Sequence, residues 1–252
     1  MSSNKTEFGP VSFVSGGPGP IDLLTLRGKK AIESAEVILY DALLDSEFLD
    51  LFPKGSVAIF VGKRADEHSR TQAEINELIL KWAKKGKRVV RLKGGDASIF
   101  GRLAEEMEAL EKEGIPFEVI PGVSSVNAGA ASLKTSLTIR GKVRQIIILD
   151  GHTILEDDRA WQGMENFQGT IAILMGTKQV KALSEKLISK GLGPSTPIFL
   201  CENVGSKEMV YTESNLGKAR SDGITKKTKG PGILFIGEAL DNNLISKRLS
   251  KE

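Results

Sequence analysis

The chain has 252 residues, of which 40% are hydrophobic and 27% charged, so it reads as a globular protein with room for one large domain or two smaller ones. With 35 Lys and Arg against 32 Asp and Glu, the net charge is only +3, and charge gives no reason to expect a nucleic-acid partner. One cysteine excludes an internal disulfide, and two histidines leave no His/Cys metal cluster. No apolar leader begins the sequence and no run of about 18 apolar residues occurs, so we expect a cytoplasmic protein without membrane contact.

The first half of the sequence alternates short apolar runs with helical patterns. A capping box at Thr71-Gln-Ala-Glu74 begins one helix, and a second helix follows over 103–110. Strands are predicted at 11–14, 35–40, 56–61, 88–92 and 117–120. This alternation predicts β-α-β units and a largely parallel sheet between helices.

Two glycine-rich loops follow predicted strands. The first, Ser15-Gly-Gly-Pro-Gly-Pro20, is neither a dinucleotide fingerprint nor a Walker loop, because Asp22 takes the position of the third glycine and no Gly-Lys-Ser/Thr follows. The second, Gly94-Gly95-Asp96, follows the buried-looking run Arg88-Val-Val-Arg-Leu92. Its glycines can adopt positive φ and let a ligand approach the backbone, while Asp96 supplies acceptor oxygens. A tight turn with Asp96 as a helix N-cap is the alternative.

Polar or glycine-rich positions follow strand after strand: Gly16, Asp41, Lys63, Asp96 and Ser124. Parallel strands place their carboxyl ends at one edge of the sheet, where open α/β sheets bind ligands. These residues are therefore predicted to converge on one site, although each by itself could be an ordinary loop residue.

The second half is predicted to form a mixed sheet. Strands are expected at 145–149, 170–176, 197–202, 208–212 and 232–237, with a helix over 180–188. The short spacing between 202 and 208 indicates a hairpin. The polar stretch 132–141 lacks periodicity and is a candidate hinge. We therefore expect two α/β domains, residues 1–136 and 137–252.

The motifs, taken together, resemble those of uroporphyrinogen-III C-methyltransferases, which are class III S-adenosylmethionine methyltransferases of the tetrapyrrole type. The resemblance runs from about Val11 to Gly237. The matching stretches are Gly17-Pro-Gly19 with Leu23-Leu-Thr-Leu26, Tyr40-Asp41, Val61-Gly-Lys-Arg64, His68, Gln72-Ala-Glu-Ile-Asn76, Gly86-Lys-Arg-Val-Val-Arg-Leu-Lys-Gly-Gly-Asp96, Ile99-Phe-Gly-Arg102, Gly114-Ile-Pro-Phe117, Val119-Ile-Pro-Gly122, Gly151-His152, Met175-Gly176 and Glu202-Asn203.

The resemblance implies two α/β domains with a cofactor cleft between them, and a homodimer. The implied reaction is methylation of two pyrrole rings of uroporphyrinogen III by S-adenosylmethionine, which gives precorrin-2, for sirohaem and cobalamin, and S-adenosylhomocysteine. Asp41 would be the proton acceptor and Lys63 the proton donor. The residues expected to hold the cofactor are Pro18, Gly94, Gly95, Asp96, Ile99, Ser124, Ser125, Met175 and Val204.

The residue types suit methyl transfer, which needs orientation and a proton acceptor but no metal. Since uroporphyrinogen carries eight carboxylates, Arg64, Arg102 and Arg140 are candidate clamps. The sequence departs from the family pattern at Pro20, at Ala97-Ser98 and at Ile139, where aspartate, Pro-Phe and histidine are usual. Two alternatives stay open: a related methyltransferase acting on another precorrin or another substrate, and a non-catalytic member that binds cofactor or tetrapyrrole.

Overall fold

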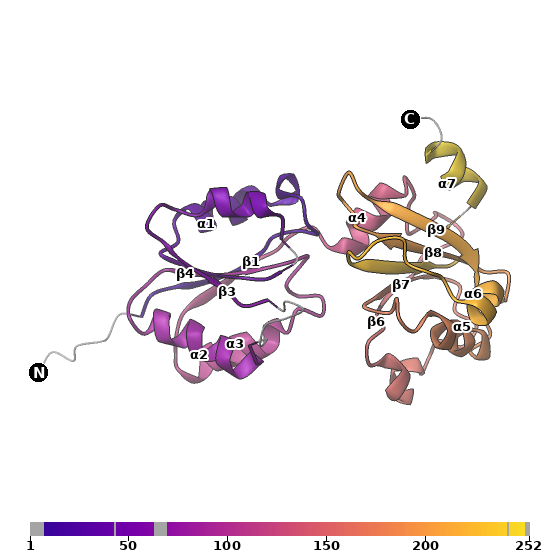
Figure 1. The fold of residues 1–252 in the computed structure, drawn as a ribbon. Helices are drawn as coiled ribbons and strands as arrows, with labels where there is room; N and C mark the ends of the chain where they lie inside the picture. Colours follow the sequence, from indigo (N-terminus) through magenta and orange to yellow (C-terminus); the bar gives the residue numbers. More distant parts are fainter. Residues whose placement is uncertain (1–7, 43, 63–69, 241, 250–252) are drawn as a thin grey trace, which may run out of the picture. The chain divides into compact units, whose positions relative to one another are not determined.

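The structure, a computed structural model, describes residues 8–42, 44–62, 70–240 and 242–249. The chain forms two compact units, residues 1–125 and 126–252 (Figure 1). No helix within the described ranges has both the length and the apolar composition needed to cross a membrane.

The first unit is a parallel α/β domain, as the alternating pattern predicted. Its five strands lie in the order β3-β2-β4-β1-β5, and every pair of neighbours is parallel. Its elements are β1 (Val11–Ser15), η1 (Ile21–Leu23), α1 (Leu26–Glu33), β2 (Val37–Tyr40), η2 (Ser46–Leu51), β3 (Val57–Phe60), α2 (Gln72–Ala83), β4 (Val89–Lys93), α3 (Leu103–Lys112) and β5 (Phe117–Ile120).

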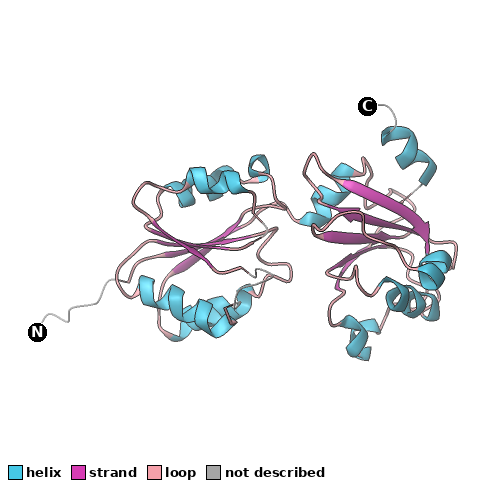
Figure 2. Ribbon diagram, viewed as in Figure 1, coloured by secondary structure: helices cyan, strands magenta, loops and turns pink. Residues whose placement is uncertain are grey.

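Helices cover both faces of this sheet (Figure 2). Phe13, Leu39 and Val89 pack on one face against apolar residues of α2 and α3. Val90 and Leu92 point to the other face, where they pack with residues of α1 and η2. Because successive residues of a strand alternate between faces, Arg91 and Lys93 share the face of Val89, beneath α2 and α3.

The second unit contains the mixed sheet that was predicted. Its order is β6-β7-β10-β8-β9; β6 and β7 are parallel, and the other neighbours are antiparallel. The predicted hairpin is confirmed as β8 and β9, although β9 begins at Val210, two residues later than expected. The elements are α4 (Ser125–Ser132), β6 (Ile146–Asp150), η3 (Ile154–Glu156), η4 (Asp158–Trp161), β7 (Thr170–Leu174), α5 (Val180–Ser189), β8 (Pro197–Glu202), β9 (Val210–Asn215), α6 (Leu216–Asp222), β10 (Gly232–Ile236) and α7 (Asn242–Leu249).

The two units meet along the chain at 125/126, whereas the sequence suggested 136/137. The difference is helix α4, which packs in the second unit. A Cβ on Gly129 of this helix would lie 2.6 Å from the Phe235 ring on β10, so the helix backbone approaches the sheet closely. α5 and α6 pack with apolar residues of β7, β8 and β10, which point to the other face.

Candidate active site

The carboxyl edge of the first sheet is closed by paired glycine loops. Gly16 donates its N–H to the carbonyl of Lys93 at 2.7 Å, and Gly17 and Gly95 exchange two backbone hydrogen bonds of 3.1 and 2.6 Å. Gly95 has φ +67°, and no atom of the described residues lies within 4 Å of the position its Cβ would take. The two loops therefore hold each other in place while one side of Gly95 stays open to a ligand.

Asp96 links two loops of this edge. Its Oδ1 accepts hydrogen bonds from the N–H and the hydroxyl of Ser98, and its Oδ2 accepts the N–H of Gly122 at 3.0 Å. Burial raises the pKa of the Asp96 carboxyl, but the bonds from Ser98 and Gly122 outweigh burial, and the pKa lies below its usual value. Asp96 is therefore a carboxylate near neutral pH and orders both the β4–α3 and the β5–α4 loops.

Ala97, at a position where the family usually has proline, makes a hydrogen bond that proline could not make. The N–H of Ala97 donates to Oγ of buried Ser15 at 2.9 Å, and proline has no N–H. Gly122 completes this corner, because a Cβ on it would lie 2.6 Å from Cβ of Ser15. The end of β1 and the loops after β4 and β5 thus meet at one point.

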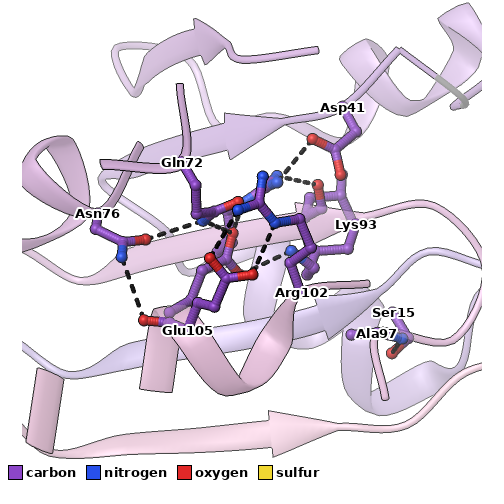
Figure 3. A network of polar contacts seen from close by, with 11 residues as sticks. Ser15, Asp41, Gln72, Asn76, Lys93, Ala97, Arg102 and Glu105 are labelled. Carbon is purple, nitrogen blue, oxygen red and sulfur yellow. Dashed lines mark hydrogen bonds and ion pairs between the residues drawn. The ribbon is translucent and has the colours of Figure 1, made fainter. Parts of the chain in front are cut away.

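Asp41, the predicted proton acceptor, lies at the end of β2 in a network of ion pairs (Figure 3). Its Oδ1 accepts a hydrogen bond from Nη2 of Arg91 at 2.7 Å. Nε of Arg91 donates to Oε1 of Glu106 at 3.0 Å, and Nζ of Lys93 donates to Oε2 of Glu106 at 2.7 Å. Gln72 adds a donor to Oε1 of Glu106 at 3.2 Å. One buried carboxylate thus holds two buried cations, and one of these cations holds Asp41.

The pKa values of the two cations move in opposite directions. Burial lowers the pKa of Arg91, but Asp41 and Glu106 together outweigh burial and raise it. Burial, and then the nearby charge of Arg91, lower the pKa of Lys93 by more than Glu106 raises it. Arg91 is therefore a permanent positive charge beside Asp41.

The other predicted residues of the first unit lie around this edge. Pro18 and Ile99 are half-buried in the loops after β1 and β4. Gly94 begins the loop after β4, between Lys93 and Gly95. Ser124 is buried, and Ser125 begins α4. Lys63 lies outside the described residues, and its predicted role as proton donor stays a prediction.

Two predicted cofactor residues belong to the second unit. Met175 follows β7 with φ +58° and is half exposed, at 51%. Val204 follows β8 and is buried, 3.4 Å from the position that a Cβ on Gly129 would take. Their place in the cofactor site stays a prediction.

The three arginines predicted to bind substrate carboxylates differ in whether another side chain already binds them. Arg102 is engaged by Glu105 through two bonds of 2.8 and 2.7 Å. Arg140 is exposed, and Arg64 lies outside the described residues. Ile139, at the position where histidine is usual, forms an isolated bridge with Val143.

Sequence reasoning missed Arg91, Lys93 and Glu106. The available signal was two cations at alternate positions of an otherwise apolar strand, which places them on one buried face and demands a counter-charge. Nothing local identifies that counter-charge as Glu106, on the following helix.

The first unit is thus an α/β sheet whose carboxyl edge carries paired glycine loops and two carboxylates, and this is the edge at which open α/β sheets bind ligands. The chain belongs to the tetrapyrrole (corrin/porphyrin) methylases, because residues 10–220 match the model of that family. The resemblance stated from the motifs is thereby confirmed.

Two relatives show how much of the chain is shared. An S-adenosyl-L-methionine-dependent uroporphyrinogen III methyltransferase of Methanosarcina barkeri (strain Fusaro / DSM 804) is 40% identical over 243 residues, which cover 95% of this chain and 94% of the relative. Siroheme synthase 1 of Yersinia pseudotuberculosis serotype I (strain IP32953) is 39% identical over 235 residues, 92% of this chain but 49% of that protein. The chain thus spans about half the length of this synthase.

Solved structures share the fold. Uroporphyrin-III C-methyl transferase from Thermus thermophilus, complexed with S-adenyl homocysteine, has a TM-score of 0.79 at 30% identity, with 92% of this chain and 98% of that chain covered. A cobalt precorrin-4 methyltransferase has a TM-score of 0.76 at 25% identity, with 92% and 96% covered. The predicted two-domain α/β fold is confirmed.

Proposed function

We propose that this chain methylates two pyrrole rings of uroporphyrinogen III with S-adenosylmethionine and gives precorrin-2, a precursor of sirohaem and cobalamin. The observation that carries the proposal is the 40% identity, over nearly the whole of both chains, to a methyltransferase whose name states this substrate and this methyl donor. The placement of Asp41 and Asp96 after the neighbouring strands β2 and β4, at one edge of the sheet, supports the proposal.

The residues at this edge fit S-adenosylmethionine. No described residue fills the side of Gly95 where a Cβ would lie, so a ligand can approach the backbone there. The partly exposed carboxylate of Asp96 accepts three bonds from Ser98 and Gly122, and a carboxylate has about four acceptor sites, so capacity for a ligand hydroxyl or ammonium group remains. We propose that Gly94, Gly95 and Asp96 hold the cofactor, together with Pro18, Ile99, Ser124, Ser125, Met175 and Val204.

The bound cofactor would supply a methyl group on a sulfonium, whose C–S electron pair stays on sulfur when a ring carbon takes the methyl. The macrocycle then loses one proton for each methyl gained. The side chain of Asp41 is 26% exposed and lies at the same sheet edge, and as a carboxylate it can accept that proton. Lys63 is proposed as the proton donor.

Methylation of another precorrin is the second candidate, and the similarity to a cobalt precorrin-4 methyltransferase favours it. The two candidates share the cofactor and differ in the acceptor. A member that binds without catalysis is the third, non-enzymatic reading.

The test is anaerobic transfer of labelled methyl from S-adenosylmethionine to uroporphyrinogen III, with the absorption spectrum of the product recorded. We expect two methyls per macrocycle and the spectrum of precorrin-2. No transfer to uroporphyrinogen III, with transfer to a later precorrin, would establish the second candidate. Tight binding of S-adenosylhomocysteine without transfer to either acceptor would establish the third.

Asp41→Asn tests the proton acceptor. The amide keeps an oxygen for Arg91 but cannot serve as the base, so product formation should slow by about 100-fold or more while S-adenosylhomocysteine binds as before. Asp50→Asn, at an exposed position of η2, is the matched control and should turn over normally. Normal turnover of Asp41→Asn would remove Asp41 from the mechanism.

We also propose that the protein is a cytoplasmic homodimer. Analytical ultracentrifugation and cell fractionation test these two points, and a monomer or a membrane-bound pool would overturn them.

A further inference from the structure

The ion pairs behind Asp41 form a chain that runs from the interior of the first unit to the proposed site. The side chain of Glu106 is fully buried, that of Arg91 is 4% exposed, and that of Asp41 is 26% exposed. Each link is short: 3.0 Å from Glu106 to Arg91 and 2.7 Å from Arg91 to Asp41. The guanidinium is fixed further, because its Nη1 donates to the carbonyl of Leu92 at 3.0 Å. Arg91 therefore has three fixed acceptors and little freedom to move.

Such a network needs an explanation besides stability. Buried ion pairs contribute little net stability compared with apolar residues of the same volume, because desolvation opposes the attraction. β4 lies between β2 and β1, and the β4 residues Val89, Val90 and Leu92 are packed in apolar cores, so an apolar residue at position 91 would suit the interior. Arg91 instead reaches Asp41, which begins the loop after the neighbouring strand.

We propose that Arg91 is a positioning residue for Asp41, and that Glu106 and Lys93 hold Arg91 in the position this requires. The inference rests on the proposed function, in which Asp41 accepts a proton from the macrocycle. Arg91 binds Oδ1 of Asp41, and among the described residues no hydrogen bond is made to Oδ2, which we assign to the proton. The carboxylate is thus held in one orientation before the substrate arrives, and such preorganisation is what proton transfer at a fixed carbon requires.

The charges of the network also bear on the reaction. Arg91 and Lys93 from β4 face Glu106 from α3 and Asp41, so the four charges sum to zero while Asp41 is a carboxylate. When Asp41 takes a proton, the group carries one positive charge in a poorly solvated place. Proton transfer to Asp41 therefore leaves Arg91 and Lys93 facing one negative charge instead of two.

A double-mutant cycle between Arg91→Lys and Asp41→Asn tests the proposal. A lysine cannot reach Asp41, Glu106 and the Leu92 carbonyl at once, so Arg91→Lys should lower kcat by about 10- to 100-fold and leave S-adenosylhomocysteine affinity unchanged. In the Asp41→Asn background the same substitution should lower kcat no further, because Arg91 acts only through Asp41. Arg159→Lys, which alters an exposed pair with Asp157, is the control and should match wild type.

The outcomes separate the inference from the proposed function. Wild type that transfers no methyl to uroporphyrinogen III overturns the proposed function, and the inference falls with it. If wild type is active, two results overturn the inference alone. One is that Arg91→Lys is as active as wild type. The other is that the kcat losses of Arg91→Lys and Asp41→Asn multiply in the double variant.

A second pair of variants decides the question should Arg91→Lys fail to fold. Glu106→Gln removes a negative charge near Asp41, so the acid limb of the kcat/KM profile should move to lower pH. Lys93→Met removes a positive charge, so the same limb should move to higher pH. A purely structural role would lower the active fraction without moving the limb. Shifts in the same direction, or no shift in either folded variant, would overturn the proposal.

Discussion

At Gly122 the close approach of two backbones decides which residue fits. A Cβ there would lie 2.6 Å from Cβ of Ser15 and 2.7 Å from its carbonyl oxygen, and neither atom can move without shifting the end of β1. Gly122→Ala should therefore destabilise the protein by about 1–3 kcal/mol, the cost of overpacking. Urea denaturation measures this loss. Gly193→Ala is the control: its new Cβ would meet no atom of the described residues closer than 3.7 Å, so stability should change by less than about 0.5 kcal/mol. Equal stabilities of the two variants would contradict the steric argument.

Asp96 should make the stability of the protein depend on pH in the acid range. Its folded-state pKa lies below the ordinary 3.8, so the unfolded chain takes up the proton first as the pH falls. The contribution of Asp96 is therefore fully present above pH 3.8 and is lost as the pH falls through the folded-state pKa.

Asp96→Asn lacks this contribution, so its Tm should lie below that of wild type near neutral pH, and the gap should close at acid pH. Thermal unfolding over a pH series measures the gap, and Asp22→Asn, at an exposed position of η1, is the control. A gap that stays constant to the lowest pH would show that Asp96 is not held as an ionised group.

Single residues also show what the sequence could and could not predict. Asp41 and Asp96 were predicted at one edge because both follow parallel strands, and the topology of the first sheet confirms that placement. The partners of Arg91 were not predictable, because Asp41 is 50 positions away in the chain and Glu106 lies on a helix. The alternation along a strand predicts on which face of the sheet a side chain lies. It does not predict which charged residue, distant in the sequence, pairs with that side chain.

At the scale of elements, local chemistry predicted well wherever one segment suffices. Both hydrogen bonds of the capping box at Thr71 are present, and α2 begins where the box indicated. Helix α4 was missed, because its small residues carry no clear apolar stripe and its place depends on the contact between Gly129 and Phe235. Contacts between distant segments, which no local pattern encodes, decided that part of the fold.

The end of β8 is stabilised by a buried carboxylate in the same way as the edge of the first sheet. Oε2 of Glu202 accepts the N–H of Lys227 at 2.8 Å, and Oε1 accepts the N–H and the hydroxyl of Thr228, both at 2.9 Å. Burial raises the pKa of Glu202, but these bonds and Lys226 outweigh burial and lower it. Glu202 therefore anchors the basic loop 226–229, and Nδ2 of the adjacent Asn203 donates to Oγ1 of Thr228 at 3.4 Å.

Glu202→Gln should release this loop. A glutamine presents an NH₂ group to at least one of these donors, so one or more charge-assisted bonds are lost, at a cost of about 1.5–3 kcal/mol. Hydrogen exchange at the amides of Lys227 and Thr228 should quicken. Glu213→Gln, at an exposed position of β9, should leave that exchange as it is. Unchanged protection in Glu202→Gln would mean that the loop is held by other contacts.

At the scale of the whole molecule, the two units have separate cores. Leu39 belongs to a core between the first sheet and the helices α2 and α3. Leu234 belongs to a core between the second sheet and the helices α5 and α6, which also contains the fully buried Trp161. The chain has two tryptophans, and the other, Trp82, packs against the first core, where its buried Nε1 has no hydrogen-bond partner among the described residues. Trp82→Phe therefore costs no hydrogen bond and leaves Trp161 as the single reporter of the second unit.

In the Trp82→Phe background, Leu39→Ala and Leu234→Ala should each cost about 2–5 kcal/mol, the usual loss for a buried leucine. Because the two cores are distinct, only Leu234→Ala should lower the midpoint reported by Trp161 fluorescence. Leu39→Ala should instead lower the midpoint at which the first unit unfolds. That unfolding is followed by the circular dichroism of the whole chain, which reports both units. If Leu39→Ala lowers the Trp161 midpoint as far as Leu234→Ala does, the units unfold as one cooperative body. Separate midpoints would mean that each unit derives its stability from its own core, so that a substitution at the sheet edge can be assigned to the unit that carries it.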